Sequence, residues 1–224
     1  YALLAYDCGD YTVTSSAPNN REAMLSAILS RQNADGGWAY AAGDPSEASM
    51  TAMAISALAP YRDRAEVGAA VTAAVDCLSA MQGPTGGYIS WGSENSNDAA
   101  MVVIALTALG IDPATDSRFV KNGSSVIDNL LSFVTDGKEF GYTDNASANP
   151  LATEQGFRAL VAYRGLKAGG FNIYRFEKAL APLPENVPDA LPTGDGRLLA
   201  TACTVTLLAA AALPLLSKRK KTAR

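Results

Sequence analysis

The sequence contains no histidine among its 224 residues. This absence excludes a histidine general base and a serine–histidine–aspartate triad within the chain. It equally excludes any metal site that needs an imidazole ligand. The most common side chain of acid–base catalysis is therefore not available to these residues.

Cysteine is scarce, with Cys8, Cys77 and Cys203 as its only occurrences and no C-x-x-C pair. Cys203 lies in an apolar segment near the C-terminus. Cys8 and Cys77 leave two alternatives open: a disulfide bond if the protein is exported, or two separately buried thiols. Burial is favoured because both residues flank predicted helices.

Charge is modest, at 18% of residues, while 48% are hydrophobic, as in an ordinary globular protein. The length is sufficient for one domain with a sizeable core. Five of the 18 basic residues lie at the C-terminus, which leaves 13 basic against 22 acidic residues in the rest of the chain. An acidic body repels phosphates, so no nucleic-acid partner is expected.

A unit of about 50 residues repeats along the chain. Each copy has a helix, a glycine–aromatic turn and a second helix. The first part occurs as AILSRQNADGGWAY (27–40), DCLSAMQGPTGGYIS (76–90) and, more weakly with Gly141-Tyr142, NLLSFVTDGKEFGYT (129–143). The second helix occurs at 50–61, 101–112 and 155–166, with starts predicted near Ser46–Ser49, Asn97–Asp98 and Thr153–Glu154.

The two helices of the unit differ in their apolar pattern. Val67, Val71, Val75 and Leu78 recur at helical spacing, which predicts one buried face for the first helix. The second helix is apolar nearly all round, which predicts an inner position. Residues 1–7 (YALLAYD) resemble the end of such an inner helix, and three incomplete hairpins cannot close a ring. We therefore expect the C-terminal part of a longer chain.

The pattern Q-x-x-x-G-x-W resembles the QW motif of the prenyltransferase and squalene-oxidase repeat families. Terpenoid cyclases, protein prenyltransferase β subunits, complement-like thioester domains and cobalamin carriers share it. The resemblance implies an all-α fold, a partial α/α toroid of helical hairpins. The motif residues are Gln32, Gly36, Trp38, Gln82, Gly86 and Tyr88. We interpret them structurally: glutamine donates to carbonyls at its helix end, glycine allows the reversal, and Trp38 packs between hairpins.

The catalytic motifs of these families do not occur in the sequence. It has no D-x-D-D acid motif of the squalene-type cyclases and no histidine for the zinc of the protein prenyltransferases. Cys8-Gly9-Asp10 does not match the Cys-Gly-Glu-Gln thioester. No catalytic residue, metal ligand or cofactor is therefore assigned, and a corrinoid ligand is implied by the resemblance alone.

Acidic, amide and aromatic residues recur where the inner helices begin. In a toroid these helix ends open onto one rim of the central cavity. Such a rim can bind a polar ligand or a sugar, or provide paired carboxylates for glycoside hydrolysis; helix capping is the favoured alternative. The candidate residues are Tyr40, Asp44, Glu47, Trp91, Glu94, Asp98, Tyr142, Asp144 and Glu154, accompanied by Asn95, Asn145 and Gln155.

The C-terminal region resembles a Gram-positive sortase sorting signal. A proline-rich linker (171–197) contains Leu191, Pro192, Thr193 and Gly194, which match L-P-x-T-G except that the intervening residue is missing. Residues 198–216 carry no charge and as a helix span about 28 Å, close to the hydrocarbon thickness of about 30 Å. We expect a toroid domain at 1–170, a transmembrane helix at 198–217 and a basic cytoplasmic tail at 218–224.

Two function classes follow. The favoured one is a non-catalytic binding module on the cell surface, with the membrane and, through sortase, peptidoglycan as partners and an unknown small ligand or surface partner. The alternative is a terpenoid cyclase- or prenyltransferase-type enzyme whose catalytic residues lie outside these 224 residues. A purely structural stalk is a third interpretation.

Overall fold

A computed structural model of the chain describes residues 1–9, 11–169 and 172–175. Helices dominate these residues. They are α1 (Ala2–Cys8), α2 (Arg21–Leu29), α3 (Ala48–Leu58), α4 (Ala65–Met81), α5 (Ser96–Ala108), α6 (Val126–Ser132) and α7 (Pro150–Lys167), with short 3-10 turns at Ala59–Tyr61 (η1) and Ser117–Phe119 (η2).

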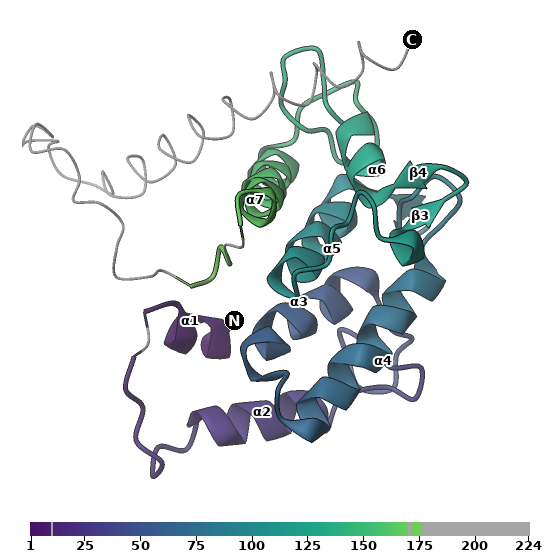
Figure 1. Cartoon of the computed structure of the whole chain (residues 1–224). Coiled ribbons are helices and arrows are strands. Elements are labelled where there is room, and N and C mark those ends of the chain that lie inside the picture. The colour runs from purple at the N-terminus through teal and green to yellow at the C-terminus, as the bar shows by residue number, and fades with distance from the viewer. Residues whose placement is uncertain (10, 170–171, 176–224) are drawn as a thin grey trace, which may run out of the picture.

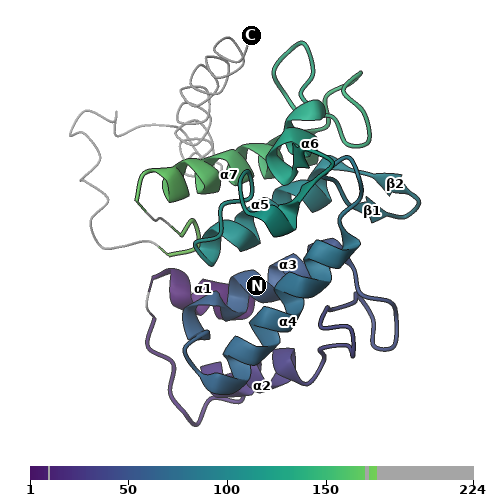
Figure 2. The same cartoon turned by 45° about the vertical axis from the view of Figure 1, so that its right-hand side comes forward.

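The helices form an inner row and an outer row, as the sequence predicts. Helix α5 packs between α3 and α7, while α2, α4 and α6 lie outside them (Figures 1 and 2). Helix α1 contacts both α2 and α3, in agreement with its identification as the end of an inner helix. The chain therefore has the helical α/α-toroid fold.

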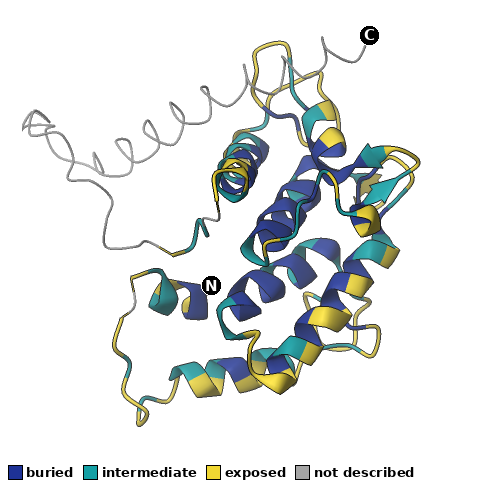
Figure 3. Cartoon of the chain, viewed as in Figure 1, coloured by how far each residue is buried: buried dark blue, intermediate teal, exposed yellow. Residues whose placement is uncertain are grey.

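Burial follows the two patterns found in the sequence. Val67, Val71, Val75 and Leu78 lie on the buried face of α4, whereas α5 is buried from Ser96 to Thr107 apart from Asn97 (Figure 3). A fully buried valine or leucine side chain contributes about 1.5–3 kcal/mol relative to its exposed state. These apolar stripes are therefore sufficient to fix which helix faces the interior.

Polar side chains begin the inner helices α5 and α7. Asn95 accepts a hydrogen bond from the Asp98 amide at 2.9 Å, and Asn149 accepts one from Ala152 at 3.0 Å. Helix α7 therefore begins at Pro150, a favourable first position. The predicted start near Thr153–Glu154 was wrong. Asn149 caps the helix and Pro150 is its first residue, and this Asn-Pro pair is a start signal that the sequence analysis did not use.

The turn after each outer helix has the same backbone hydrogen bonds in all three repeats. An amide at the start of the turn donates to a carbonyl four residues later. The pairs are Asn33 to Gly37 at 2.9 Å, Gly83 to Gly87 at 2.8 Å and Thr135 to Glu139 at 2.9 Å.

The motif glutamine joins one repeat to the next. The Gln32 amide nitrogen donates to the carbonyls of Gly36 and Ala70, both at 2.8 Å. The Gln82 amide nitrogen donates to Gly86 at 2.9 Å and to Phe119 at 3.0 Å. The expectation that glutamine caps its own helix was wrong, because the second acceptor lies in the following hairpin.

The motif glycine has a positive φ and little space around it. Gly36 has φ 88° and Gly86 has φ 82°, a region that glycine adopts without a steric penalty. A Cβ atom at Gly86 would lie 2.4 Å from the Ser125 carbonyl oxygen. The turn thus lies directly against the backbone of the next repeat.

The third repeat departs from the predicted alignment by two residues. Phe140 is 1% exposed and its amide donates to Thr153, as the amide of the buried Trp38 donates to Thr51. Tyr142, the predicted equivalent of Trp38, is 40% exposed. Lys138, with φ 68°, takes the place of the motif glycine, which hides the repeat from a search for Gly-Gly.

Short strands modify the all-α expectation. Strand β1 (Ile89–Ser90) pairs antiparallel with β2 (Ser93–Glu94), and β3 (Val120–Lys121) pairs with β4 (Ser124–Ser125). The β1–β2 hairpin connects the second turn to α5. It thereby places Ser90 and Trp91 beside the first turn of that helix.

The two cysteines in the described region are free. Cys77 is buried, and burial raises the pKa of its thiol to about 11, so the thiol stays protonated at neutral pH. The disulfide alternative is not realised in this structure.

No helix among the described residues is long and apolar enough to span a membrane. The proposed transmembrane helix at 198–217, the sorting motif, the linker from residue 176 onward and the basic tail lie outside the described residues.

Candidate functional site

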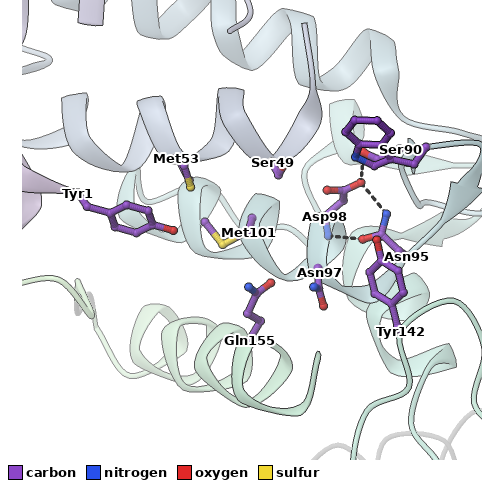
Figure 4. Close-up of a pocket in the computed structure, with 11 residues that line it drawn as sticks. Tyr1, Ser49, Met53, Ser90, Asn95, Asn97, Asp98, Met101, Tyr142 and Gln155 are labelled. Atoms are coloured by element: carbon purple, nitrogen blue, oxygen red, sulfur yellow. Dashed lines mark hydrogen bonds between the residues drawn. The ribbon is translucent and has the colours of Figure 1, made fainter. Parts of the chain in front are cut away.

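A cavity of about 230 Å³ lies where the inner helices α3, α5 and α7 begin (Figure 4). The β1–β2 hairpin borders it as well. Its lining residues are Tyr1, Ser49, Met53, Ser90, Trp91, Asn95, Asn97, Asp98, Met101, Tyr142 and Gln155. We call it the Asp98 cavity.

Asp98 is the charged side chain of this cavity and is 4% exposed. One carboxylate oxygen, Oδ2, accepts hydrogen bonds from the Ser90 hydroxyl and from the Asn95 amide nitrogen, the latter at 2.8 Å. The other oxygen points away from these two donors and toward the cavity (Figure 4). Asp98 also lies in the first turn of α5, where the helix dipole favours a negative charge.

Two further acceptors are left without partners. The amide oxygens of Asn97 and Gln155 are buried and accept no hydrogen bond from the described residues. Leaving such a group unsatisfied costs about 1–3 kcal/mol, so the polar wall of the cavity is not fully satisfied by the described residues. Besides these two amides, the cavity is lined by the Asp98 carboxylate and by the hydroxyl groups of Ser49, Ser90 and Tyr142, so its polar lining offers both donors and acceptors.

Trp91 lines the cavity on its exposed side and has a strained backbone conformation. It is 91% exposed and has φ 54° at the tip of the β1–β2 hairpin, followed by Gly92 at φ 85°. A non-glycine residue in this region costs about 1–3 kcal/mol. Strain and exposure together at an aromatic residue favour a role in binding.

A second cavity, of about 280 Å³, adjoins the first, because Tyr1 and Met53 line both. Its wall is mainly apolar and contains Ile28, Trp38 and Met50. Arg31 and Tyr40 also line it. The guanidinium of Arg31 makes no hydrogen bond or ion pair with the described residues. The two cavities together offer an apolar space between a carboxylate and a cation.

The structure brings together three of the nine rim residues predicted from the sequence: Trp91, Asp98 and Tyr142. Tyr40 lines the neighbouring apolar cavity instead. Asn95 and Gln155 also belong to the Asp98 cavity.

The remaining carboxylates of the predicted rim have local structural roles. Glu94 accepts hydrogen bonds from Thr85 and Asn129, and Glu154 pairs with Arg158 one turn later in α7. Asp144 accepts from the Ala146 amide within its loop. Glu47 is the residue before α3, and Asp44 is exposed.

The sequence analysis missed Ser90 and the methionines of the cavity. Met53 and Met101 stand in the apolar inner helices, where nothing distinguishes them from core residues. Ser90 acts from the hairpin, which the sequence did not predict. A metal centre has no support, since no group of three or more potential ligands occurs in the described part of the chain.

Comparison with known proteins gives a family and two relatives. The prenyltransferase alpha-alpha toroid domain matches residues 1–150. A drimenyl diphosphate synthase of Streptantibioticus cattleyicolor is 32% identical over 117 residues, covering 50% of this chain and 20% of the relative. A second, of Streptomyces showdoensis, is 29% identical over 181 residues, covering 77% of this chain and 31% of the relative.

These findings overturn the favoured interpretation of a non-catalytic binding module. Both relatives are named as synthases, and the similarity to one of them covers 77% of this chain. The chain spans less than a third of the length of these relatives. The missing D-x-D-D motif therefore did not exclude an enzyme, because so much of a related protein lies beyond the matched region.

Proposed function

The chain belongs to the prenyltransferase α/α-toroid family, and from that premise we propose that it forms part of a terpenoid cyclase-type enzyme acting on an isoprenoid diphosphate. The observation that carries the proposal is the similarity to two drimenyl diphosphate synthases. The aligned region of one of them spans most of the described residues. A terpenoid cyclase-type enzyme was the alternative that the sequence raised, whereas a non-catalytic binding module was its favoured interpretation.

The adjoining cavities support this function by their shape and lining. An isoprenoid chain is a flexible hydrocarbon, and Met50, Met53 and Trp38 provide apolar surface of the kind that ligand pockets use. Arg31 offers a cation suited to a phosphate oxygen at the edge of this surface. In the proposed arrangement the hydrocarbon lies along Met53 and the diphosphate lies near Arg31.

In this proposal, the described residues form part of the wall of the cavity in which the isoprenoid is cyclised. A cyclisation that keeps the diphosphate must begin with protonation of the hydrocarbon, and squalene-type cyclases use the D-x-D-D motif for that step. The motif is absent from the 224 residues. We therefore place the initiating acid outside them and assign binding and shaping of the isoprenoid to the residues described here.

Ligand binding tests this function directly. The purified chain is titrated with farnesyl diphosphate while its tryptophan fluorescence is followed, since Trp38 and Trp91 line the two cavities. Saturable binding is expected, tighter than that of the straight-chain dodecyl diphosphate. Isothermal titration of the same pair gives an independent affinity.

Two matched substitutions locate the binding. Met53→Gln places an amide between the cavities and is expected to weaken farnesyl diphosphate at least about tenfold, or about 1.4 kcal/mol. Met81→Gln makes the same change at the end of the outer helix α4 and is expected to leave the affinity unchanged. Absence of saturable binding, or equal effects of the two substitutions, would contradict the proposed function.

Attachment to the cell surface is a separate proposal that rests on the sequence alone. The uncharged run 198–216, the basic residues after it and the Leu-Pro-Thr-Gly motif support it. After expression in a Gram-positive host, wall-linked protein cut after Thr193 supports sortase attachment, with peptidoglycan as partner. Detergent-extracted intact protein supports a membrane anchor, and intact protein in the cytosol without detergent contradicts both.

A further inference from the structure

The tip of the β1–β2 hairpin holds a tryptophan in a backbone conformation that suits it poorly. Trp91 has φ 54° and Gly92 has φ 85°, so both central residues of the turn have a positive φ, as in a type I′ turn. A left-handed backbone brings the Cβ atom close to the following carbonyl oxygen and is unusual for a bulky residue. The turn is therefore strained at Trp91.

The second hairpin of the chain contains the residues that such a turn prefers. Strands β3 and β4 are joined by Asn122 (φ 50°) and Gly123 (φ 81°), and Asn-Gly is a favoured pair in a type I′ turn. Both hairpins have two residue pairs between their strands. The same turn is thus made once with a residue that fits it and once with an exposed tryptophan. Formation of the hairpin alone does not explain the tryptophan.

The exposure of Trp91 leaves this strain without compensation from burial. Its side chain is 91% exposed, although it borders the Asp98 cavity. Most residues that line this cavity are polar, and Met53 and Met101 are its aliphatic members. The empty cavity therefore offers an indole ring little apolar surface to pack against. An apolar molecule in the cavity would supply that surface.

The base of the hairpin is fixed, whereas its tip has space to move. The Ser90 hydroxyl donates a hydrogen bond to the Asp98 carboxylate (Figure 4). On the other strand, the Glu94 carboxylate accepts one from Thr85. Around Gly92, in contrast, no atom of the described residues lies within 4 Å of the position that a Cβ atom would take. A change of conformation can therefore be confined to the two residues of the turn.

Two turn types are compatible with the conformation of Gly92. The third residue of the turn has φ of about 80–90° in both type I′ and type II, while the second residue has a positive φ in type I′ and a negative φ in type II. A change at Trp91 between these types therefore removes its strain and keeps Gly92 near φ 85°. The twist of the strands favours type I′, whereas the tryptophan favours type II. These opposing preferences give the turn two accessible states.

We propose that Trp91 is a ligand-dependent cover of the Asp98 cavity. With the cavity empty, the turn is type I′ and the indole is exposed to solvent. When an apolar molecule binds, the turn changes type, and the indole packs over the ligand at the opening of the cavity. The class of ligand rests on the proposed function, because an isoprenoid has the apolar surface that the indole requires. Closure also limits the access of water to the bound molecule.

Quenching of a single tryptophan tests the cover. The chain has two tryptophans, so Trp38→Phe leaves Trp91 as the only one, and the buried Phe140 shows that the equivalent position of another repeat accepts phenylalanine. Quenching by acrylamide is measured without ligand and with farnesyl diphosphate or 1-octanol at concentrations that calorimetry shows to be saturating. The quenching constant of Trp91 is expected to fall at least about threefold when either ligand shifts the chain to the closed state.

Exchange of the tip residues between the two hairpins is the second test. Trp91→Asn is expected to raise the unfolding midpoint by about 2–4 °C, because asparagine suits the left-handed position. The same variant is expected to bind each ligand of the native chain at least about fivefold more weakly. Asn122→Trp is the matched control, since Asn122 does not line the Asp98 cavity. It should lower the midpoint and leave both affinities unchanged.

The results distinguish the cover from the proposed function. Equal quenching with and without bound ligand overturns the cover, and so does an affinity that Trp91→Asn leaves unchanged or a midpoint that this substitution lowers. If farnesyl diphosphate still binds in any of these cases, the cyclase-type function stands and only the cover fails. If 1-octanol binds and shields Trp91 but farnesyl diphosphate does not bind, the cover stands and the isoprenoid function fails. If neither ligand binds, both proposals fail.

Discussion

The aromatic residue after each turn shows how one repeat position tolerates different side chains. Trp38 donates its indole N–H to the Ile28 carbonyl at 2.8 Å, whereas the Tyr88 hydroxyl is buried and has no hydrogen-bond partner among the described residues. Burial raises the pKa of Tyr88 above its usual range. Phe140 fills the third position and packs edge-on against Phe157. The volume of an aromatic ring, rather than its polar group, is the shared requirement.

Trp38→Ala is expected to lower the free energy of unfolding by about 3–5 kcal/mol, the range for large aromatic side chains in a core. The reason is its burial at 5% exposure together with the lost bond to Ile28. Denaturant unfolding measures the change. Trp91→Ala serves as the control, with an expected change within about 0.5 kcal/mol because Trp91 is exposed. Comparable losses in both variants would refute the assignment of Trp38 to the core.

Lys138→Gly is expected to stabilise the third turn. Lys138 has φ 68° at the position that Gly36 and Gly86 occupy in the other repeats. A left-handed backbone costs a non-glycine residue about 1–2 kcal/mol, while glycine loses about 0.5–1 kcal/mol more backbone entropy on folding. A net gain of up to about 1.5 kcal/mol in the free energy of unfolding is expected, and it should appear as a higher unfolding midpoint. Destabilisation instead would show that the lysine side chain makes a contribution larger than this strain.

At the scale of elements, the glutamine of the turn connects an outer helix to the next hairpin. Gln82→Leu removes the hydrogen bonds to Gly86 and Phe119 and leaves both carbonyls unsatisfied. A loss of about 1–3 kcal/mol is expected for such buried groups. Gln32→Leu is expected to lose less, because Gln32 is only partly buried and water can replace its bonds. Unfolding measured on both variants tests this order, and a larger loss for Gln32→Leu would reverse it.

A polar network joins α1 to α2 and η1. Asp7 accepts hydrogen bonds from the Arg21 guanidinium at 2.8 Å and from the Tyr61 hydroxyl at 2.8 and 2.9 Å. Burial, assisted by the bond to Asp7, raises the pKa of Tyr61 to about 12. Loss of the proton from Tyr61 would remove its hydrogen bond to Asp7 and so weaken one of the contacts that hold α1, while the bonds of Arg21 remain.

The pH dependence of this network has a definite sign. Tyrosine titrates near 10 when unfolded, so the contribution of the raised Tyr61 pKa is complete below about pH 10. It is lost as the pH rises through about 12, where the folded protein also ionises. In Tyr61→Phe, the free energy of unfolding should therefore fall less steeply than in the native chain over this interval. Parallel curves for the two proteins would exclude a role for Tyr61.

At the scale of the whole molecule, the sequence predicted the two helical rows because burial dominates helix placement. Val67, Val71 and Val75 could occupy only an inward face, and the apolar residues of α5 left no exposed side. The third turn was misplaced because Lys138 replaces the glycine and Gly141-Tyr142 imitates the motif. Local patterns could not resolve this ambiguity, whereas the backbone hydrogen bonds do.

The site was partly predictable for a similar reason. Asp98, Trp91 and Tyr142 were found because helix starts on one side of a toroid converge. Met53 and Met101 were missed since a cavity wall and a packed core use the same side chains. The favoured function was wrong because it relied on the absence of the D-x-D-D motif from these 224 residues. The related synthases are much longer than the matched region, so this absence does not argue against an enzyme.

The hydrogen bonds of the motif glutamines make the repeats depend on one another in a single direction. Gln32 needs a carbonyl of α4, and Gln82 needs one from η2, so each turn is completed by residues that follow it. Val134 at the corresponding position of the third turn offers no such donor. As in other linear repeat proteins, each repeat is then stabilised by its nearest neighbours. For these glutamine bonds the dependence has one direction, since each turn relies on the repeat that follows it. Loss of a later hairpin removes an acceptor from the one before it, and unravelling that begins at α6 and α7 is passed back toward α2.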